Sequence, residues 1–146
     1  MKHNNSKYTH SRTCVYNINY HIIWGTKYRN KWLTPALEDE VKQILIDIAK
    51  EKGFSIDHIE IGLDDHIHLL VAAPPKISVT VIVKYLKGIS SFRLFRLHPE
   101  LKQFYWKETD RHIWSPSYFV ESIGTTNADA VAKYIDDQRK KEQKYD

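Results

Sequence analysis

The segment from His66 to Ala73 most narrowly limits the folds open to this chain, because its two sides differ chemically. Successive side chains of an extended strand point to opposite faces of a sheet. One face here is aliphatic and consists of Ile67, Leu69 and Val71. The other face carries His66 and His68, and Pro74-Pro75 ends the segment because proline cannot donate a ladder hydrogen bond. The pattern predicts a strand with one face on a core and two imidazoles on the other.

The residues upstream of this strand predict an arm, a strand and a helix. Residues 1–12 are rich in Asn, Ser, Lys and His, which predicts a loose arm. From Thr13 to Trp24, large apolar side chains alternate with polar ones, which predicts a half-buried strand. Thr34-Pro35 supplies an N-cap and a first-turn proline for a helix that Gly53 closes. The expected buried face of this helix is Leu37, Val41, Ile44, Leu45 and Ile48.

A second strand is expected before the histidines and a second helix after them. Phe54 to Leu63 alternates, and the break from Gly62 to Asp65 is short enough for a hairpin turn. The two faces of this strand are Ile59, Ile61 and Leu63, and His58 and Glu60. The second helix is expected from Ser78 to Leu97. Its inward residues are Val79, Ile82, Leu86 and Ile89, and its polar face is Lys84, Lys87 and Ser91.

The remaining third of the chain predicts one more strand and one more helix. After a connection from Pro99 to Asp110, Tyr118 to Ile123 is typical of a strand, and Asn127 caps a final helix. The order is strand, helix, strand, strand, helix, strand, helix. It predicts an α+β fold with an antiparallel sheet and helices packed on it, close to a ferredoxin-like or RNA-recognition topology. Topology alone leaves the function open.

Length and charge add weaker constraints. The chain has 146 residues, which suits a single domain spanning residues 1–146. Its formal net charge is +4, and basic residues lie beside aromatic ones at 27–31 and 84–96 and in a basic tail at 139–146. Basic grooves with aromatic side chains suit single-stranded nucleic acid, although a solvated surface with ordinary core aromatics gives the same sequence pattern.

Cysteine usage and the N-terminus bear on the compartment. Cys14 is the one cysteine of the sequence, so no internal disulfide can form. The N-terminus has no long apolar run of the kind that forms a signal peptide or a membrane span. We therefore expect a cytoplasmic protein that does not enter a membrane.

His66 and His68 are the first candidates for chemistry. Two imidazoles that are two residues apart on a rigid strand can bind one metal ion. Neighbouring polar residues that could orient them are His58, Glu60, Asp64 and Asp65. The alternative is that all of these are polar surface residues of a strand and a turn.

The expected final helix carries a second candidate pair. Tyr134 and Gln138 are one helical turn apart, on a stripe shared with Val131 and Ile135. A glutamine on an inward stripe is costly to bury without a partner, and a metal would be a partner for its carbonyl oxygen. The alternative is a core tyrosine with a glutamine at the edge of the core.

Five stretches in order across nearly the whole chain resemble the single-tyrosine transposases of prokaryotic insertion sequences (the insertion-sequence 200/605 group). This group is part of the His-hydrophobic-His (HUH) endonuclease superfamily. The stretches are Tyr20-His21-Ile22-Ile23-Trp24-Gly25-Thr26-Lys27-Tyr28-Arg29, Asp65-His66-Ile67-His68-Leu69-Leu70-Val71, Leu86-Lys87-Gly88-Ile89-Ser90-Ser91, Trp114-Ser115-Pro116-Ser117-Tyr118-Phe119-Val120 and Tyr134-Ile135-Asp136-Asp137-Gln138. One departure is Leu63-Asp64-Asp65, where family members often have a proline before the aspartate.

The resemblance implies an HUH architecture and a role for each matched site residue. His66, His68 and Gln138 are then the metal ligands, for Mg²⁺ or Mn²⁺, and Tyr134 is the nucleophile. The implied reaction cleaves and rejoins single-stranded DNA at hairpin-bearing element ends through a 5'-phosphotyrosine and a 3'-hydroxyl. The resemblance also implies a homodimer whose active sites are shared between subunits. The basic side chains expected to contact DNA are Lys27, Arg29, Lys84, Lys87, Arg93 and Arg96.

Three other functions fit parts of the same sequence. A non-catalytic module that binds single-stranded nucleic acid needs the fold but not Tyr134. A metal-dependent phosphodiesterase that activates water needs the histidines and forms no covalent adduct. A domesticated relative keeps the cleavage chemistry but processes repeated hairpin DNA of the chromosome.

Overall fold

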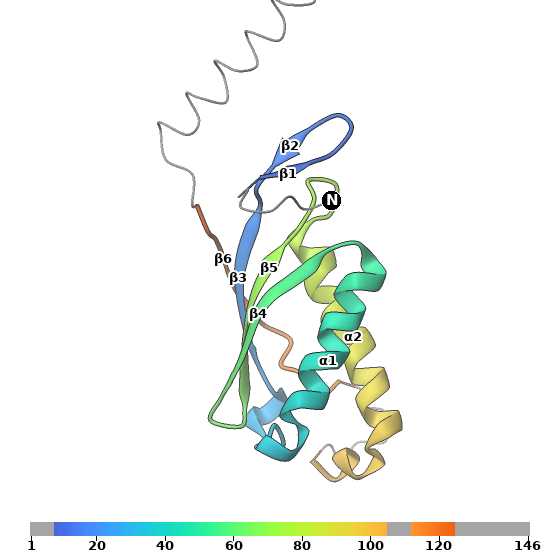
Figure 1. Cartoon of the computed structure of the whole chain (residues 1–146). Coiled ribbons are helices and arrows are strands. Elements are labelled where there is room, and N and C mark those ends of the chain that lie inside the picture. The colour runs from blue at the N-terminus through green and yellow to red at the C-terminus, as the bar shows by residue number, and fades with distance from the viewer. Residues whose placement is uncertain (1–7, 105–111, 125–146) are drawn as a thin grey trace, which may run out of the picture.

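A four-stranded antiparallel sheet forms one layer of the protein, and two helices cover one of its faces (Figure 1). The computed structural model describes residues 8–104 and 112–124. The sheet strands are β3 (Asn19–Gly25), β4 (Ser55–Gly62), β5 (His66–Ala72) and β6 (Phe119–Ser122). The helices are α1 (Pro35–Lys52) and α2 (Val79–Leu97), and two 3-10 helices are η1 (Lys27–Arg29) and η2 (Pro99–Phe104). No helix in the described ranges is long and apolar enough to cross a membrane.

The strand order confirms the predicted α+β, ferredoxin-like topology. The order across the sheet is β4-β5-β3-β6, and every neighbouring pair is antiparallel. Helix α1 connects β3 to β4 with β5 between them, and α2 leads from β5 toward β6 with β3 between them. Two interleaved strand-helix-strand units therefore place both helices on the same face of the sheet.

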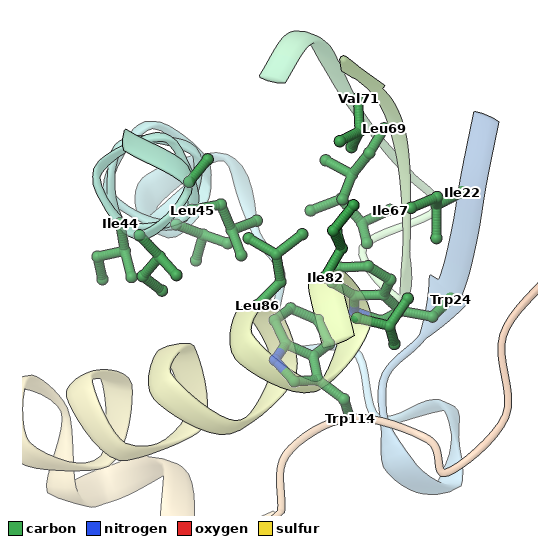
Figure 2. Packing of buried hydrophobic residues seen from close by; sticks show 14 of the residues in the cluster. Ile22, Trp24, Ile44, Leu45, Ile67, Leu69, Val71, Ile82, Leu86 and Trp114 are labelled. Carbon is green, nitrogen blue, oxygen red and sulfur yellow. The ribbon is translucent and has the colours of Figure 1, made fainter. Parts of the chain in front are cut away.

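The core lies between this sheet face and the two helices (Figure 2). In register, Ile22 of β3 faces Leu69 of β5, and both are fully buried. The predicted face of α1 is confirmed, since Val41, Ile44, Leu45 and Ile48 are buried and Leu37 is partly buried. Gly53 ends α1 with a φ of 87°, a left-handed conformation that glycine adopts without strain.

Two details of the expected strands are wrong. The segment 13–24 divides into β2 (Val15–Tyr16) and β3, and β2 pairs with β1 (Thr9–His10), which we expected to be part of a loose arm. Ser11 closes this small hairpin, because its hydroxyl accepts a hydrogen bond from the Cys14 N–H and donates one to the Cys14 carbonyl. Side-chain hydrogen bonds of this kind favour a turn over a continuous strand.

Leu63 also departs from its predicted place on the apolar face of β4. It lies in the turn between β4 and β5 with a φ of 52°, and its side chain is 75% exposed. A tight turn that places two successive residues, Leu63 and Asp64, in the left-handed region interrupts the alternation of the strand. The predicted faces of Ile59, Ile61, His58 and Glu60 are kept, despite a bulge between Ile56 and His58.

The segment that leads into β6 is fixed to the core by tryptophan. The Trp114 ring lies 5.7 Å from the Trp24 ring and 5.2 Å from the Trp32 ring, measured between centroids. Its indole N–H donates to the Ser90 hydroxyl of α2 at 2.7 Å, in a buried position. The chain on either side of Trp114 is thus held between α2 and the end of β3.

We expect Ser90→Ala to destabilise the fold by about 1–3 kcal/mol, because the Trp114 N–H then stays buried without its acceptor. The measurement is urea unfolding at neutral pH, followed by tryptophan fluorescence. Thr80→Ala on the exposed side of the same helix is the control and should change stability by less than about 0.5 kcal/mol. Equal effects of the two substitutions would contradict the anchoring role.

Candidate functional site

The face of the sheet opposite the helices carries the two histidines of β5, as the alternation predicted. The imidazoles of His66 and His68 have their centroids 5.0 Å apart, with 60° between the ring planes. In register, His68 lies between Glu60 of β4 and Ile23 of β3. Because β5 is a central strand with its other side buried, both rings are held by a rigid element.

Two glycines flank His66 in the sheet. Gly62 of β4 and Gly25 of β3 are its partners in register. A Cβ atom at Gly62 would lie 2.4 Å from Nε2 of His66 and 2.5 Å from its Cε1, which is closer than atoms can approach. The His66 ring therefore lies over Gly62 in space that any other residue would fill.

Asp65 orients the His66 ring. Its side chain is 5% exposed, and one carboxylate oxygen lies 2.9 Å from Nδ1 of His66. Hydrogen bonds from Lys31 and then from His66 hold the pKa of the Asp65 carboxyl well below its usual range. The carboxylate can therefore only accept, so the proton of a neutral His66 is on Nδ1 and its Nε2 is left as a metal donor.

The same carboxylate binds two cations from the turn after β3. Lys31 Nζ donates to it at 2.9 Å, and the Arg29 guanidinium donates to both of its oxygens at 3.3 Å. The turn reaches this position because Tyr28 and Arg29 adopt left-handed φ values of 60° and 56°. Backbone bonds join the two segments as well, since the Thr26 N–H donates to the Asp65 carbonyl at 2.8 Å.

His68 has the properties of a neutral metal ligand. Burial, followed by the nearby charges of His66 and His21, lowers the pKa of its imidazole below the usual value. Metal ions bind the neutral form of imidazole, so a lowered pKa keeps His68 ready to coordinate at neutral pH. His21 of β3 stacks on it, with the ring centroids 5.7 Å apart, and Phe119 lies edge-on to His21 at 6.3 Å. His21 was not predicted as a site residue, although it occupies a polar position in the alternation of β3.

A hollow of about 580 Å³ opens beside the histidines. The opposite wall is formed by the chain between Trp114 and β6, through Ser115, Ser117 and Tyr118. Phe119 is 52% exposed, so an aromatic ring is presented close to the hollow. The site therefore combines two metal donors, open space and an aromatic surface.

The predicted DNA contacts have different surroundings. Arg29 lies in the wall of the hollow while bound to Asp65, and Lys87 is half-buried. Lys84 is exposed, and Arg93 pairs with Glu51 at 2.8 Å. Two other cations lie over aromatic rings: Lys27 over Tyr28 and Arg96 over Phe92. Ser91, which we expected on a shared polar face with Lys84 and Lys87, is 2% exposed. The segment at Ile113 covers it, and the Ile113 N–H donates to the Ser91 hydroxyl at 3.4 Å.

The other candidate site residues either pair with a neighbouring side chain or lie outside the part of the chain that the structure describes. Among the described residues, no group of three His, Cys, Asp or Glu side chains could hold a metal ion. Glu60 binds His58 at 2.9 Å, and Asp65 orients His66. Tyr134 and Gln138 lie outside the described residues. The described residues therefore offer two imidazole donors, His66 and His68, that could bind a metal ion.

Comparison with known families adds a match over most of the chain. The model of a family described as "Transposase IS200 like" matches residues 14–138. The chain belongs to this family. The ISDra2 transposase TnpA of Deinococcus radiodurans is 37% identical over 131 residues, which cover 90% of this chain and 91% of that protein. The transposase for insertion sequence element IS200 of Salmonella typhimurium is 34% identical, over 84% of this chain and 78% of that protein.

Solved structures agree with the fold of this IS200-like transposase. A crystal structure of a chain from Deinococcus radiodurans R1, described as that of a transposase, superposes with a TM-score of 0.71 at 37% identity. The match covers 89% of this chain and 97% of that one. A REP-associated tyrosine transposase bound to a REP hairpin superposes with a TM-score of 0.51 at 13% identity, over 81% of this chain, which supports the fold alone.

We expect Asp65→Asn to lower the free energy of unfolding at pH 7 by about 1–3 kcal/mol, since the buried carboxylate that accepts hydrogen bonds from three side chains is neutralised. Because folding lowers the pKa of Asp65, its stabilisation is full above the unfolded value of 3.8 and is lost as the pH falls below it. Urea unfolding between pH 3 and 8 measures both effects. Asp64→Asn in the same turn is the control, and an acid dependence that is equal in the two variants would refute this role.

Proposed function

We propose that this transposase cleaves and rejoins single-stranded DNA at insertion-sequence ends, in a metal-dependent reaction with Tyr134 as the nucleophile. One observation carries the proposal: His66 and His68 lie side by side on the open sheet face, and a buried carboxylate fixes the first of them. Membership of the IS200-like transposase family supports it. The single domain over residues 1–146 and the cytoplasmic location stay predictions from the sequence.

The donor set suits a divalent ion. His66 and His68 provide neutral nitrogen donors, and Gln138 provides a carbonyl oxygen as the third protein ligand in this proposal. Nitrogen and oxygen donors fit Mn²⁺ well and Mg²⁺ when phosphate oxygens complete the shell. A bound ion would polarise the scissile phosphate and stabilise the charge of the transition state. The rigid strand and Asp65 keep the two imidazoles oriented for this task.

Tyr134 would act as the attacking group. A phenol has a pKa of about 10, so at neutral pH only about one molecule in a thousand is ionised, a deficit of roughly 4 kcal/mol. In the proposed step the phenol oxygen gives its proton to solvent and bonds to phosphorus, and the bond from phosphorus to the 3' oxygen breaks as that oxygen takes up a proton from solvent. The 3' oxygen leaves as a hydroxyl, and the other DNA end stays on Tyr134 as a 5'-phosphotyrosine. Attack by a new 3'-hydroxyl reverses the step and frees the tyrosine, so strands are exchanged without an energy cofactor.

The proposed partners are hairpin-bearing DNA ends and a second copy of the chain. The tyrosine transposase with a similar fold is bound to a REP hairpin, and we propose a hairpin of DNA as the substrate here. The aromatic Phe119 and the cation Arg29 near the histidine hollow are suited to bases and phosphates. A homodimer in which Tyr134 and Gln138 complete the partner's site follows from the family resemblance and stays a prediction.

Incubation with single-stranded hairpin DNA from the ends of the element and with Mn²⁺ should give a protein-DNA adduct that survives denaturing electrophoresis. Tyr134→Phe removes the attacking oxygen and EDTA removes the metal, so each should abolish the adduct. An adduct that persists in Tyr134→Phe would disprove the role of this residue. Cleavage without any adduct would instead indicate hydrolysis by activated water, and binding without cleavage would indicate a binding module.

We also expect Gly62→Ala to weaken Mn²⁺ binding by about 10–100-fold, because its Cβ displaces the His66 ring. Calorimetric titration of the full chain with Mn²⁺ measures this. Gly88→Ala is the control, since no atom of the described part of the chain lies within 4 Å of the added Cβ and the exposed helix position favours alanine by about 1 kcal/mol. Circular dichroism checks that both variants fold. Unchanged Mn²⁺ affinity in a folded Gly62→Ala protein would remove His66 from the ligand set.

A further inference from the structure

A second, smaller hollow adjoins the one at the histidines. Its volume is about 210 Å³, and we call it the lysine hollow after Lys27 and Lys87 in its wall. His112 and Ser115 also line it, and Ser115 lines the histidine hollow too. The volume lies below the range of about 300–1,000 Å³ that is usual for pockets that enclose a small molecule. It suits a group the size of a phosphate better than a whole nucleotide.

Lys87 brings a positive charge into this hollow from α2. Its ammonium donates to the Ser115 carbonyl at 2.7 Å and to the Ser117 carbonyl at 2.8 Å. Burial lowers the pKa of Lys87 to about 8. An ammonium has three N–H groups, so one more can donate to an anion, and neither carbonyl neutralises the charge. Lys87 is therefore both a support of the wall segment and a potential anion ligand.

Lys27, the first residue of η1, lines the same hollow. Its backbone N–H donates to the Ile113 carbonyl at 2.8 Å, and the Ser115 N–H donates to the Gly25 carbonyl at 2.9 Å. Thr26 and Trp114 form a further antiparallel bridge between these segments. The two lysines thus approach from α2 and η1, two elements that the same tryptophan-anchored chain holds together. Positions fixed in this way favour a defined anion site over a diffuse basic surface.

We propose that the lysine hollow binds the backbone phosphate of a nucleotide next to the cleavage site, with Lys27 and Lys87 as its ligands. This inference rests on the proposed function. A strand whose scissile phosphate lies at the histidines can pass over Ser115 and place a neighbouring phosphate between the two lysines. Two cations favour an anion over a metal ion, and the phosphodiester is the anion that a DNA strand supplies at regular intervals.

The bound phosphate would also stabilise the wall of the histidine hollow. An anion at Lys87 favours its charged form, and the charged form makes stronger hydrogen bonds to the carbonyls of Ser115 and Ser117. These residues line the histidine hollow. Occupation of the lysine hollow would therefore help to hold that wall in place while the scissile phosphate is bound.

The test combines protein variants with DNA in which one phosphate at a time is a neutral methylphosphonate. Fluorescence anisotropy measures binding of the single-stranded hairpin end in EDTA, so neither metal nor catalysis is needed. In the wild type, one methylphosphonate beside the cleavage site should weaken binding about tenfold, the loss of one charged pair. In Lys27→Gln or Lys87→Gln the same methylphosphonate should weaken binding less than about twofold, because the lysine that binds this phosphate is already missing.

Two further variants separate a phosphate contact from general effects. Lys50→Gln removes one charge from an exposed site on α1 and should keep the full tenfold effect. Lys87→Arg keeps the charge, so the methylphosphonate should still weaken binding about tenfold. Each Lys→Gln change in the hollow should reduce the slope of log affinity against log salt concentration for single strands by about 0.7. Coupling that is absent for both Lys27→Gln and Lys87→Gln, or equal coupling for Lys50→Gln, overturns the proposal.

The outcome is distinguishable from failure of the proposed function. If the wild type forms the covalent adduct but no methylphosphonate position couples to the lysines, cleavage stands and the phosphate site is wrong. If one position couples to both lysines but no adduct forms in Mn²⁺, the phosphate site stands and the proposed reaction is wrong.

Discussion

The arrangement of the site depends on one buried carboxylate, that of Asp65. It binds the imidazole of the next residue and two cations from the turn after β3, while its backbone carbonyl accepts from Thr26. A carboxylate that is almost fully buried must be compensated, and here the compensation comes from groups that also shape the site. The left-handed residues of η1 accompany the contact of Arg29 with this carboxylate, and the tautomer of His66 follows from its charge.

The two faces of the sheet have different roles: one packs in the core and the other carries the histidines. Ile67, Leu69 and Val71 bury one face of β5 against the helices, so His66 and His68 need not contribute to the core (Figure 2). Trp114 anchors the chain before β6, and the ammonium of Lys87 binds the carbonyls of Ser115 and Ser117 in that chain. This connection therefore forms the second wall of the hollow. Rigid support on both sides would suit the phosphoryl transfer that we propose for this site.

Much of the fold could be predicted, because alternation and helix caps are local signals. The ends of α1 at Pro35 and Gly53 and the pairing of His66 with His68 on one face needed no long-range information. The small hairpin at Ser11 and the exposed Leu63 were predicted wrongly, since side-chain bonds and left-handed turn residues interrupt a strand without changing its hydropathy. His21 was missed because a polar residue on a half-buried strand has no distinctive pattern of its own.

The sequence by itself determined which side chains share a face, because side-chain direction follows from the period of the strand or helix. It also carried the five stretches that identify an IS200-like transposase, a conclusion that the family match supports. Only the tertiary structure decided what the charged residues do. Arg29 and Lys31 bind Asp65, and Lys87 binds Ser115 and Ser117, because turn geometry and packing bring together groups that are distant in the chain. No local period encodes such distances, so they emerge only when the whole domain is folded.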